Sequence, residues 1–117
     1  MATVLLVEDN DDVRDMMSVA LQLAGIAVLT ARHGREALDI LDSSDPPCLI
    51  LLDLMMPVMD GWQFRDALNS DPRRARIPVV VVSAMAEDLA AGLGATAFLP
   101  KPVDIDQMLD VVCEHCQ

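Results

Sequence analysis

The chain has 117 residues, of which 53% are hydrophobic, and this length fits one domain, residues 1–117. Its 8 basic and 19 acidic residues give a formal net charge of −11, which argues against direct binding to nucleic acid, since that needs clustered Lys and Arg. Every apolar run is interrupted well before the roughly 20 residues needed to cross a bilayer, so no membrane association is expected.

From the amino terminus onward, short β-branched apolar runs alternate with helical patterns. The runs predict buried strands at residues 3–7, 27–31, 49–52, 78–82 and 97–99. The helical spacing predicts helices at residues 11–24, 34–41, 60–68 and 103–113, with Asp60 as an N-cap, and one short helix at 87–93. Runs that are apolar on both faces are typical of a parallel sheet covered by helices. The alternation therefore predicts an α/β fold with a doubly wound sheet and right-handed crossovers.

Polar residues stand where the predicted strands end. Glu8 and Asp9 follow the first strand, and Asp53 closes the third. Ser83 closes the fourth strand, and Lys101 follows the fifth. Any one of the acids could simply cap a helix. Together, however, these residues fall at the carboxyl edge of a parallel sheet, where such folds bind their ligands, so we expect one site there.

The residue types at this edge indicate phosphoryl chemistry. Carboxylates about 4 Å apart repel by roughly 4 kcal/mol at an effective dielectric constant of 20, so a cation is expected between them. Oxygen ligands without His or Cys favour a hard ion such as Mg²⁺, with Mn²⁺ as a substitute. Asp53 is the candidate nucleophile, and a carboxylate that attacks phosphorus gives an acyl phosphate. Ser83 and Lys101 would then stabilise the phosphoryl oxygens.

Four stretches of the chain resemble the receiver domain of two-component response regulators. They are Val-Glu-Asp at 7–9, Asp-Leu-Met-Met-Pro-Val-Met-Asp-Gly at 53–61, Ser-Ala at 83–84 and Lys-Pro at 101–102. The resemblance covers essentially the whole chain. It implies a flavodoxin-like (βα)5 fold with strand order 2-1-3-4-5 and a cis peptide bond before Pro102. Because the segment between Ser83 and Lys101 is about one helical turn shorter than usual in the family, we expect a shortened fourth helix.

The resemblance also implies a role for each site residue. It assigns Mg²⁺ binding to Glu8, Asp9, Asp53 and the backbone carbonyl of Met55, phosphorylation to Asp53, phosphoryl contacts to Lys101, and switching to Ser83 and Phe98. The donor would be a histidine kinase or phosphotransfer protein, and the chain would catalyse its own phosphorylation and slow dephosphorylation. The implied partners are a downstream effector and a second copy of the chain in a phosphorylation-dependent homodimer.

Three competing functions make different demands on the sequence. A related phosphatase would carry its general acid two residues after the nucleophile, where this chain has Met55. A nucleotide-binding protein would need a glycine-rich loop after the first strand, but residues 8–12 are acidic or polar and would repel phosphates. The alternative that stays open is a pseudo-receiver, a docking module that works without phosphorylation.

Two further expectations concern the cellular environment. Cys48, Cys113 and Cys116 are an odd number of cysteines in a chain rich in core residues, which favours reduced thiols over a disulfide framework. The spacing of Cys113 and Cys116 is also poor support for a metal or redox motif, because the pair lies at the end of a helix. The amino terminus lacks the basic start and cleavage site of a secretory signal, so we expect a cytoplasmic protein.

Overall fold

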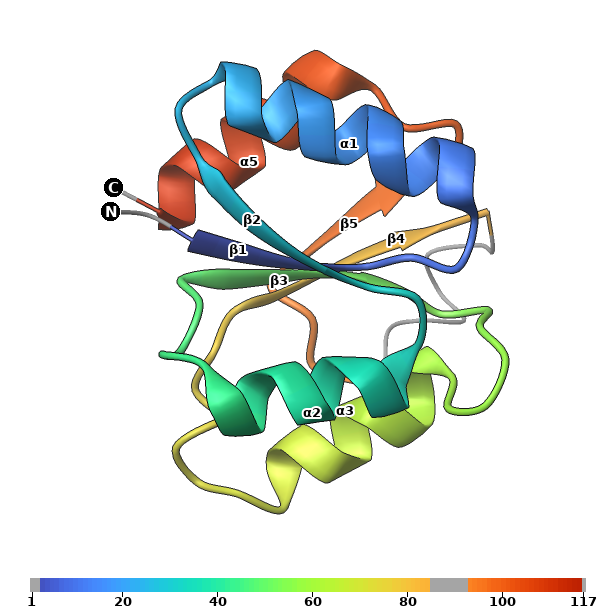
Figure 1. The fold of residues 1–117 in the computed structure, drawn as a ribbon, viewed down its shortest axis with the longest axis vertical. Helices are drawn as coiled ribbons and strands as arrows, with labels where there is room; N and C mark the ends of the chain where they lie inside the picture. Colours follow the sequence, from blue (N-terminus) through green and yellow to red (C-terminus); the bar gives the residue numbers. More distant parts are fainter. Residues whose placement is uncertain (1–2, 85–92, 117) are drawn as a thin grey trace.

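The computed structural model describes residues 3–84 and 93–116, and its strands form one five-stranded parallel sheet in the order β2-β1-β3-β4-β5 (Figure 1). The strands are β1 (Thr3–Val7), β2 (Ala27–Ala31), β3 (Leu49–Asp53), β4 (Val79–Ser83) and β5 (Ala97–Pro100). The predicted fold class and strand order are confirmed. Strands β3 and β4 are buried along their whole length, as their apolar sequences predict.

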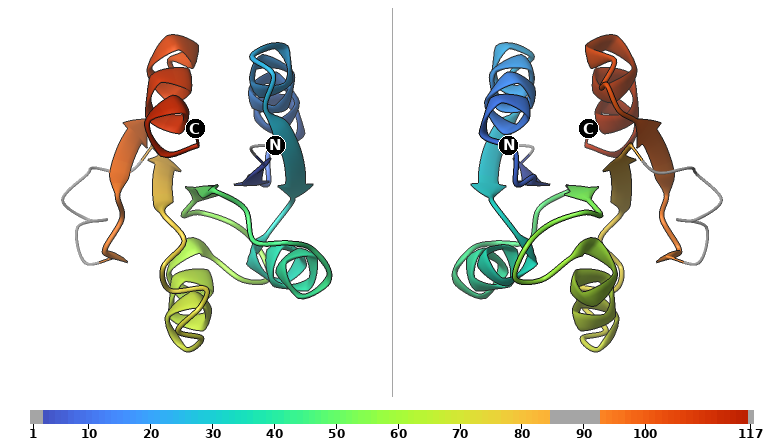
Figure 2. Two further views of the ribbon diagram at one scale, coloured as in Figure 1. Left: turned by 90° about the vertical axis from the view of Figure 1, so that its left-hand side faces the viewer. Right: turned by 90° about the vertical axis from the view of Figure 1, so that its right-hand side faces the viewer.

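Helices cover both faces of the sheet. They are α1 (Asp11–Leu23), α2 (Gly34–Ser43), α3 (Gly61–Asn69) and α5 (Ile105–His115). Helices α1 and α5 lie on one face, and α2 and α3 lie on the other (Figures 1 and 2). The core is divided accordingly into two apolar clusters, one on each side of the sheet. The short helix predicted at 87–93 lies outside the described residues except for Leu93, which is buried. In the described part of the chain, no helix has the length and apolarity required to span a bilayer.

Each described helix follows a strand in the sequence and begins with a side chain that caps its first turn. Asp60 is confirmed as the N-cap of α3, where it forms a capping box with Gln63. Helix α5 begins two residues later than predicted, because Asp104 caps it by accepting a hydrogen bond from the backbone of Gln107. Such caps contribute about 1 kcal/mol each. They fix the helix starts at the carboxyl edge of the sheet, next to the candidate site.

Cys48 and Cys116 form a disulfide, with their Cα atoms 5.4 Å apart. The expectation of reduced thiols is therefore wrong for this pair. Cys113 remains a free and exposed thiol. The reason is tertiary: the end of α5 packs beside the residue that precedes β3, although 68 positions of sequence separate the two cysteines. Neither the number of cysteines nor their spacing could show this proximity.

Candidate functional site

Three carboxylates converge at the carboxyl edge of the sheet. Glu8 and Asp9 directly follow β1, and Asp53 is the last residue of β3. One carboxylate oxygen from each residue lies within 4.8 Å of those of the other two. Glu8 and Asp53 are only 1% and 4% exposed, whereas Asp9 is exposed. The structure thus brings together the three acids that the sequence predicted, two of them buried and one open to solvent.

Lys101 lies against the two buried acids. Its Nζ is 2.5 Å from Oε1 of Glu8 and 3.3 Å from Oδ2 of Asp53. Its backbone N–H donates to the carbonyl of Ser83, and its peptide bond to Pro102 is cis. When all of these groups are ionised, three carboxylates and one ammonium leave two negative charges without a counter-charge. A divalent cation would supply the missing charge, so the donor set fits a hard metal ion.

The crowding of charge changes the pKa values of two of these groups. Burial raises the pKa of Asp53 to about 7, and the hydrogen bond and negative charge of Glu8 add to this rise, while Lys101 opposes it. Burial alone would lower the pKa of Lys101, but its hydrogen bond to Glu8 and the charge of Asp53 outweigh burial and raise it. Near neutral pH, the Asp53 carboxyl is therefore protonated in a fraction of the protein molecules. A cation that binds Asp53 in these molecules has to displace the proton.

The turn after β1 holds the carboxylate of Glu8 from two sides. The backbone N–H of Asn10 donates to Oε2 of Glu8 at 3.2 Å, and Lys101 contacts the other oxygen. The backbone N–H of Glu8 in turn donates to the carbonyl of Ala31, at the end of β2. Glu8 is therefore fixed at its backbone and at both carboxylate oxygens.

The end of β3 is held by the start of α3. A Cβ atom on Gly61 would lie 2.6 Å from Cδ2 of Leu54 and 2.9 Å from the carbonyl oxygen of Asp53, so only glycine fits this approach. The backbone N–H of Gly61 donates to the carbonyl of Leu54, and that of Met55 donates to Oδ1 of Asp53. These contacts fix the direction in which the Asp53 side chain leaves the strand.

The structure places Ser83 at the same edge but Phe98 deeper in the sheet. Ser83 is the last residue of β4, is 1% exposed, and pairs in register with Pro100. Phe98 lies within β5 opposite Val81, and its half-buried ring packs on the apolar cluster shared with α2 and α3. Phe98 is therefore a core neighbour of the site rather than a part of the acidic cluster.

The motifs of the sequence do not identify one residue that lies beside the site. Arg14, in α1, reaches back to the carbonyl of Glu8. The only available signal is that Arg14 is the sole Lys or Arg among the first 31 residues.

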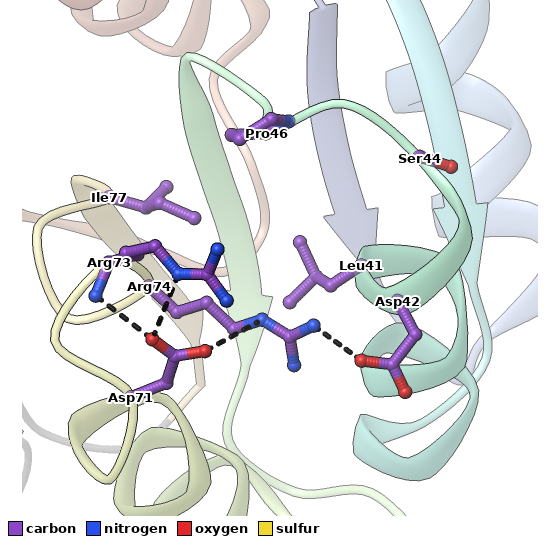
Figure 3. Close-up of a pocket in the computed structure, with 8 residues that line it drawn as sticks. All are labelled: Leu41, Asp42, Ser44, Pro46, Asp71, Arg73, Arg74 and Ile77. Carbon is purple, nitrogen blue, oxygen red and sulfur yellow. Dashed lines mark hydrogen bonds and ion pairs between the residues drawn. The ribbon is translucent and has the colours of Figure 1, made fainter.

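A separate pocket of about 270 Å³ lies at the opposite edge of the sheet, where β3 and β4 begin (Figure 3). The guanidinium of Arg74 crosses it and forms ion pairs with Asp42 at the end of α2 and with Asp71 after α3. Arg73 also pairs with Asp71. These ion pairs join the end of α2 to the segment after α3. Each charged side chain that lines the pocket therefore has a partner of opposite charge within the pocket.

Comparison with known proteins relates nearly all of the chain to one family. The family model described as "Response regulator receiver domain" matches residues 4–113. The DNA-binding dual master transcriptional regulator RpaA of Synechocystis is 35% identical over 113 residues, which are 93% of this chain and 46% of that protein. An uncharacterized 14.6 kDa protein of Leptolyngbya boryana is 32% identical over 117 residues, 97% of this chain and 88% of that protein. The chain spans about half the length of most of the curated relatives it matches.

Solved structures give the same result. The chemotaxis protein CheY4 of Vibrio cholerae superposes with a TM-score of 0.89 and 32% sequence identity, covering 98% of both chains. A response regulator receiver protein from Pseudomonas putida superposes with a TM-score of 0.89 and 29% identity, covering 97% of this chain and 96% of that one. The similarity extends over the complete sheet and its helices.

Proposed function

This chain belongs to the response regulator receiver domain family, and from this premise we propose that it is a signalling switch that accepts a phosphoryl group on Asp53. The proposal takes residues 1–117 as one receiver domain. The observation that carries it is the buried carboxylate of Asp53, which lies within 4.8 Å of the carboxylate oxygens of Glu8 and Asp9 and 3.3 Å from Nζ of Lys101.

The proposed reaction depends on Mg²⁺, for which Mn²⁺ could substitute. Glu8, Asp9, Asp53 and the backbone carbonyl of Met55 would hold the ion. Two observations support this assignment. The cluster has two negative charges without a counter-charge, and all of its donor atoms are oxygens. When bound, the ion would neutralise negative charge on the phosphoryl oxygens during transfer.

Transfer requires Asp53 in its ionised form. One oxygen of its carboxylate attacks phosphorus, so that a new O–P bond forms while the bond between phosphorus and the donor's leaving group breaks. Lys101, now paired with Glu8 and Asp53, would turn its ammonium toward a phosphoryl oxygen, and the hydroxyl of Ser83 would donate to another. Attack of water on phosphorus would later break the O–P bond to Asp53, release inorganic phosphate and return Asp53 to its carboxylate. Phe98, packed beneath this edge, would respond to the movement of Ser83 and alter the surface of β5 and α5.

The proposed donor is a histidine kinase or phosphotransfer protein, and the proposed reader is a downstream effector or a second phosphorylated copy of the chain. Three hydrophobic side chains on α1 support a protein partner: Met16, Val19 and Leu23 are 44%, 55% and 84% exposed. Their spacing of three and four residues places them on one face of the helix. An apolar face of this kind is typical of a protein interaction surface.

A cytoplasmic location is part of the same proposal. Because cytoplasmic glutathione and thioredoxin keep most thiols reduced, a cytoplasmic location requires that the disulfide between Cys48 and Cys116, which the structure contains, is open in the cell. Alkylation of thiols in intact cells, followed by mass spectrometry, tests this expectation. Recovery of the pair as a disulfide from freshly quenched cells would contradict a reducing location.

Acetyl phosphate with Mg²⁺ tests the phosphorylation directly. We expect the intact mass to rise by one phosphoryl group in the wild type and not in Asp53→Asn, and beryllofluoride with Mg²⁺ to change the fluorescence of Trp62, the only tryptophan. Both responses should disappear when Mg²⁺ is removed by chelation. No mass change and no fluorescence change in the wild type would favour the alternative, a pseudo-receiver that docks proteins without phosphorylation.

A further inference from the structure

We propose that Arg14 is a positioning residue for the acidic pair Glu8 and Asp9, and that it strengthens Mg²⁺ binding by holding the peptide unit between them. The inference rests on the proposed function, because it assumes that these acids bind Mg²⁺. The bond from Arg14 to this peptide unit would strengthen Mg²⁺ binding, whereas the positive charge of Arg14 would by itself weaken it.

The contacts of Arg14 connect α1 to the peptide that carries both acids. Its Nη1 donates to the carbonyl oxygen of Glu8 at 3.0 Å, and its Nη2 donates to Oδ1 of Asp11 at 2.5 Å. The side chain of Arg14 is 14% exposed, while that of Asp11 is 77% exposed. A planar guanidinium with several fixed donors suits this bridge, which the single ammonium of a lysine cannot reproduce.

The carbonyl of Glu8 belongs to the same rigid peptide unit as the backbone nitrogen of Asp9. Fixing this carbonyl therefore fixes the plane from which both residues leave the backbone. Glu8 has further restraints on its carboxylate, from Asn10 and Lys101. Asp9 is exposed, so its direction depends more strongly on the backbone. Loss of the Arg14 contact should thus act mainly on the placement of Asp9.

Helix α1 gives Arg14 a firm base. The side chain of Asn10 caps the helix by accepting from Val13 N–H at 2.9 Å, and the backbone N–H of Arg14 donates to the carbonyl of Asn10. Further along α1, Met17 and Leu21 are buried in the core. The guanidinium is therefore attached to an element that packing holds in place, and it transfers that position to the turn after β1.

The charge of Arg14 and its position predict opposite changes in Mg²⁺ affinity. A positive charge near a cation site repels the cation, so removing the charge alone should tighten Mg²⁺ binding. Removing the bond to the carbonyl of Glu8 should instead weaken it, because outer contacts that orient metal ligands typically contribute 10- to 100-fold to affinity. The direction of the change in affinity therefore separates the two effects.

The test is isothermal titration of Mg²⁺ into the wild type and Arg14→Met. We expect the dissociation constant to rise roughly tenfold in Arg14→Met. Arg35→Met is the matched control, since Arg35 also forms an ion pair with an acid on its own helix, Asp39, but is 63% exposed and lies on α2. Its Mg²⁺ affinity should stay within about twofold of the wild type, because exposed ion pairs contribute little.

Arg14→Lys and a kinetic measurement complete the design. Arg14→Lys keeps the positive charge but cannot contact both the carbonyl of Glu8 and the carboxylate of Asp11, so it should also bind Mg²⁺ more weakly than the wild type. This variant replaces Arg14→Met in the test if Arg14→Met does not fold. For Arg14→Met, the rate of phosphorylation by acetyl phosphate should recover toward the wild-type rate at saturating Mg²⁺. Unchanged or tighter Mg²⁺ binding in both variants, beside a wild type that binds Mg²⁺, would overturn the role of Arg14. A wild type that binds no Mg²⁺ would overturn the proposed function itself.

Discussion

The carboxyl group of Asp53 lies in surroundings that disfavour its charge. Burial and the neighbouring Glu8 raise its pKa from 3.8 to about 7. Between these values the folded protein binds more protons than the unfolded chain, so this group makes the free energy of unfolding fall as the pH rises through that window. A divalent cation reverses the disadvantage by pairing with the ionised form.

Urea unfolding at pH 5 and pH 8 without divalent cations measures this effect. From pH 5 to pH 8, we expect the wild type to lose on the order of 2 kcal/mol of unfolding free energy relative to Asp53→Asn, whose side chain does not titrate. Addition of Mg²⁺ at pH 8 should restore stability to the wild type and not to Asp53→Asn. Parallel pH profiles for the two proteins would contradict the raised pKa of Asp53.

Val58, in the loop between β3 and α3, has a backbone conformation that β-branched residues rarely adopt. Its φ is +66° and its side chain is 77% exposed. Strain of this kind costs about 1–3 kcal/mol, and asparagine tolerates the left-handed region far better. We therefore expect Val58→Asn to raise the free energy of unfolding by about 1 kcal/mol in urea titrations.

The control for this substitution is Val58→Ile, which keeps the β-branch and should leave stability unchanged. Equal stability of the Asn and Ile variants would show that the left-handed conformation of Val58 carries no measurable cost. The strain lies five residues after Asp53, in the loop between β3 and α3, and strained residues of this kind cluster in functional loops.

Among the elements, the exposed face of α1 allows the proposed recognition of a protein donor to be tested separately from the proposed phosphoryl chemistry. Its members Met16, Val19 and Leu23 lie on the side of the helix that the core does not cover. We expect Val19→Glu to slow phosphoryl transfer from a histidine kinase identified by phosphotransfer profiling at least tenfold, because burial of a charge in an apolar interface is unfavourable. Phosphorylation by acetyl phosphate should be unchanged.

Asn69→Asp adds the same charge at an exposed position of α3, on the other face of the sheet from α1, and serves as the control. It should slow transfer from the kinase far less than Val19→Glu. Equal losses in both variants would assign the effect to net charge, and an equal loss with acetyl phosphate would assign it to damage of the site.

Sequence patterns predict the strands of the described residues because each is a short run made up mostly of apolar residues. The predicted ends are less accurate: Asp53 and Ser83 belong to β3 and β4, since their backbones continue the pairing with the neighbouring strands. The order of polar residues after the strands was also sufficient to predict the acidic cluster, because parallel strands end at one edge of the sheet.

What the sequence could not provide depends on contacts between distant segments or on backbone groups. The bond from Arg14 to Glu8 ends on a carbonyl oxygen, which every residue possesses, so no residue pattern marks it. The disulfide joins residues 68 positions apart, and only the packing of α5 beside the start of β3 reveals it. Contacts of these two kinds have no local signature.

At the scale of the whole molecule, the disulfide between Cys48 and Cys116 should be a major source of stability. A crosslink over 68 positions restricts the unfolded chain by about 4 kcal/mol in the chain-entropy model. We expect reductant to lower the midpoint of thermal unfolding of the wild type clearly. Cys48→Ser should unfold at the reduced protein's midpoint with or without reductant.

Cys113→Ser provides the matched control, because it removes an exposed cysteine that forms no disulfide. It should keep both the midpoint of the oxidised wild type and its response to reductant. The same midpoint for oxidised and reduced wild type would contradict a stabilising role of the crosslink.

The disulfide also divides the protein into a covalent ring and a branch. The ring runs from residue 48 to 116 and contains β3, β4 and β5, while the branch before it contains β1 and β2. Under oxidising conditions a protease that cuts the ring once leaves one covalent molecule, whereas a cut in the branch releases a fragment. Glu8 and Asp9 lie on the branch, and Asp53 and Lys101 lie on the ring. The acidic cluster is therefore complete only while β1 lies between β2 and β3 in the sheet. Binding of a cation to the cluster would thus indicate that the branch is paired with the ring.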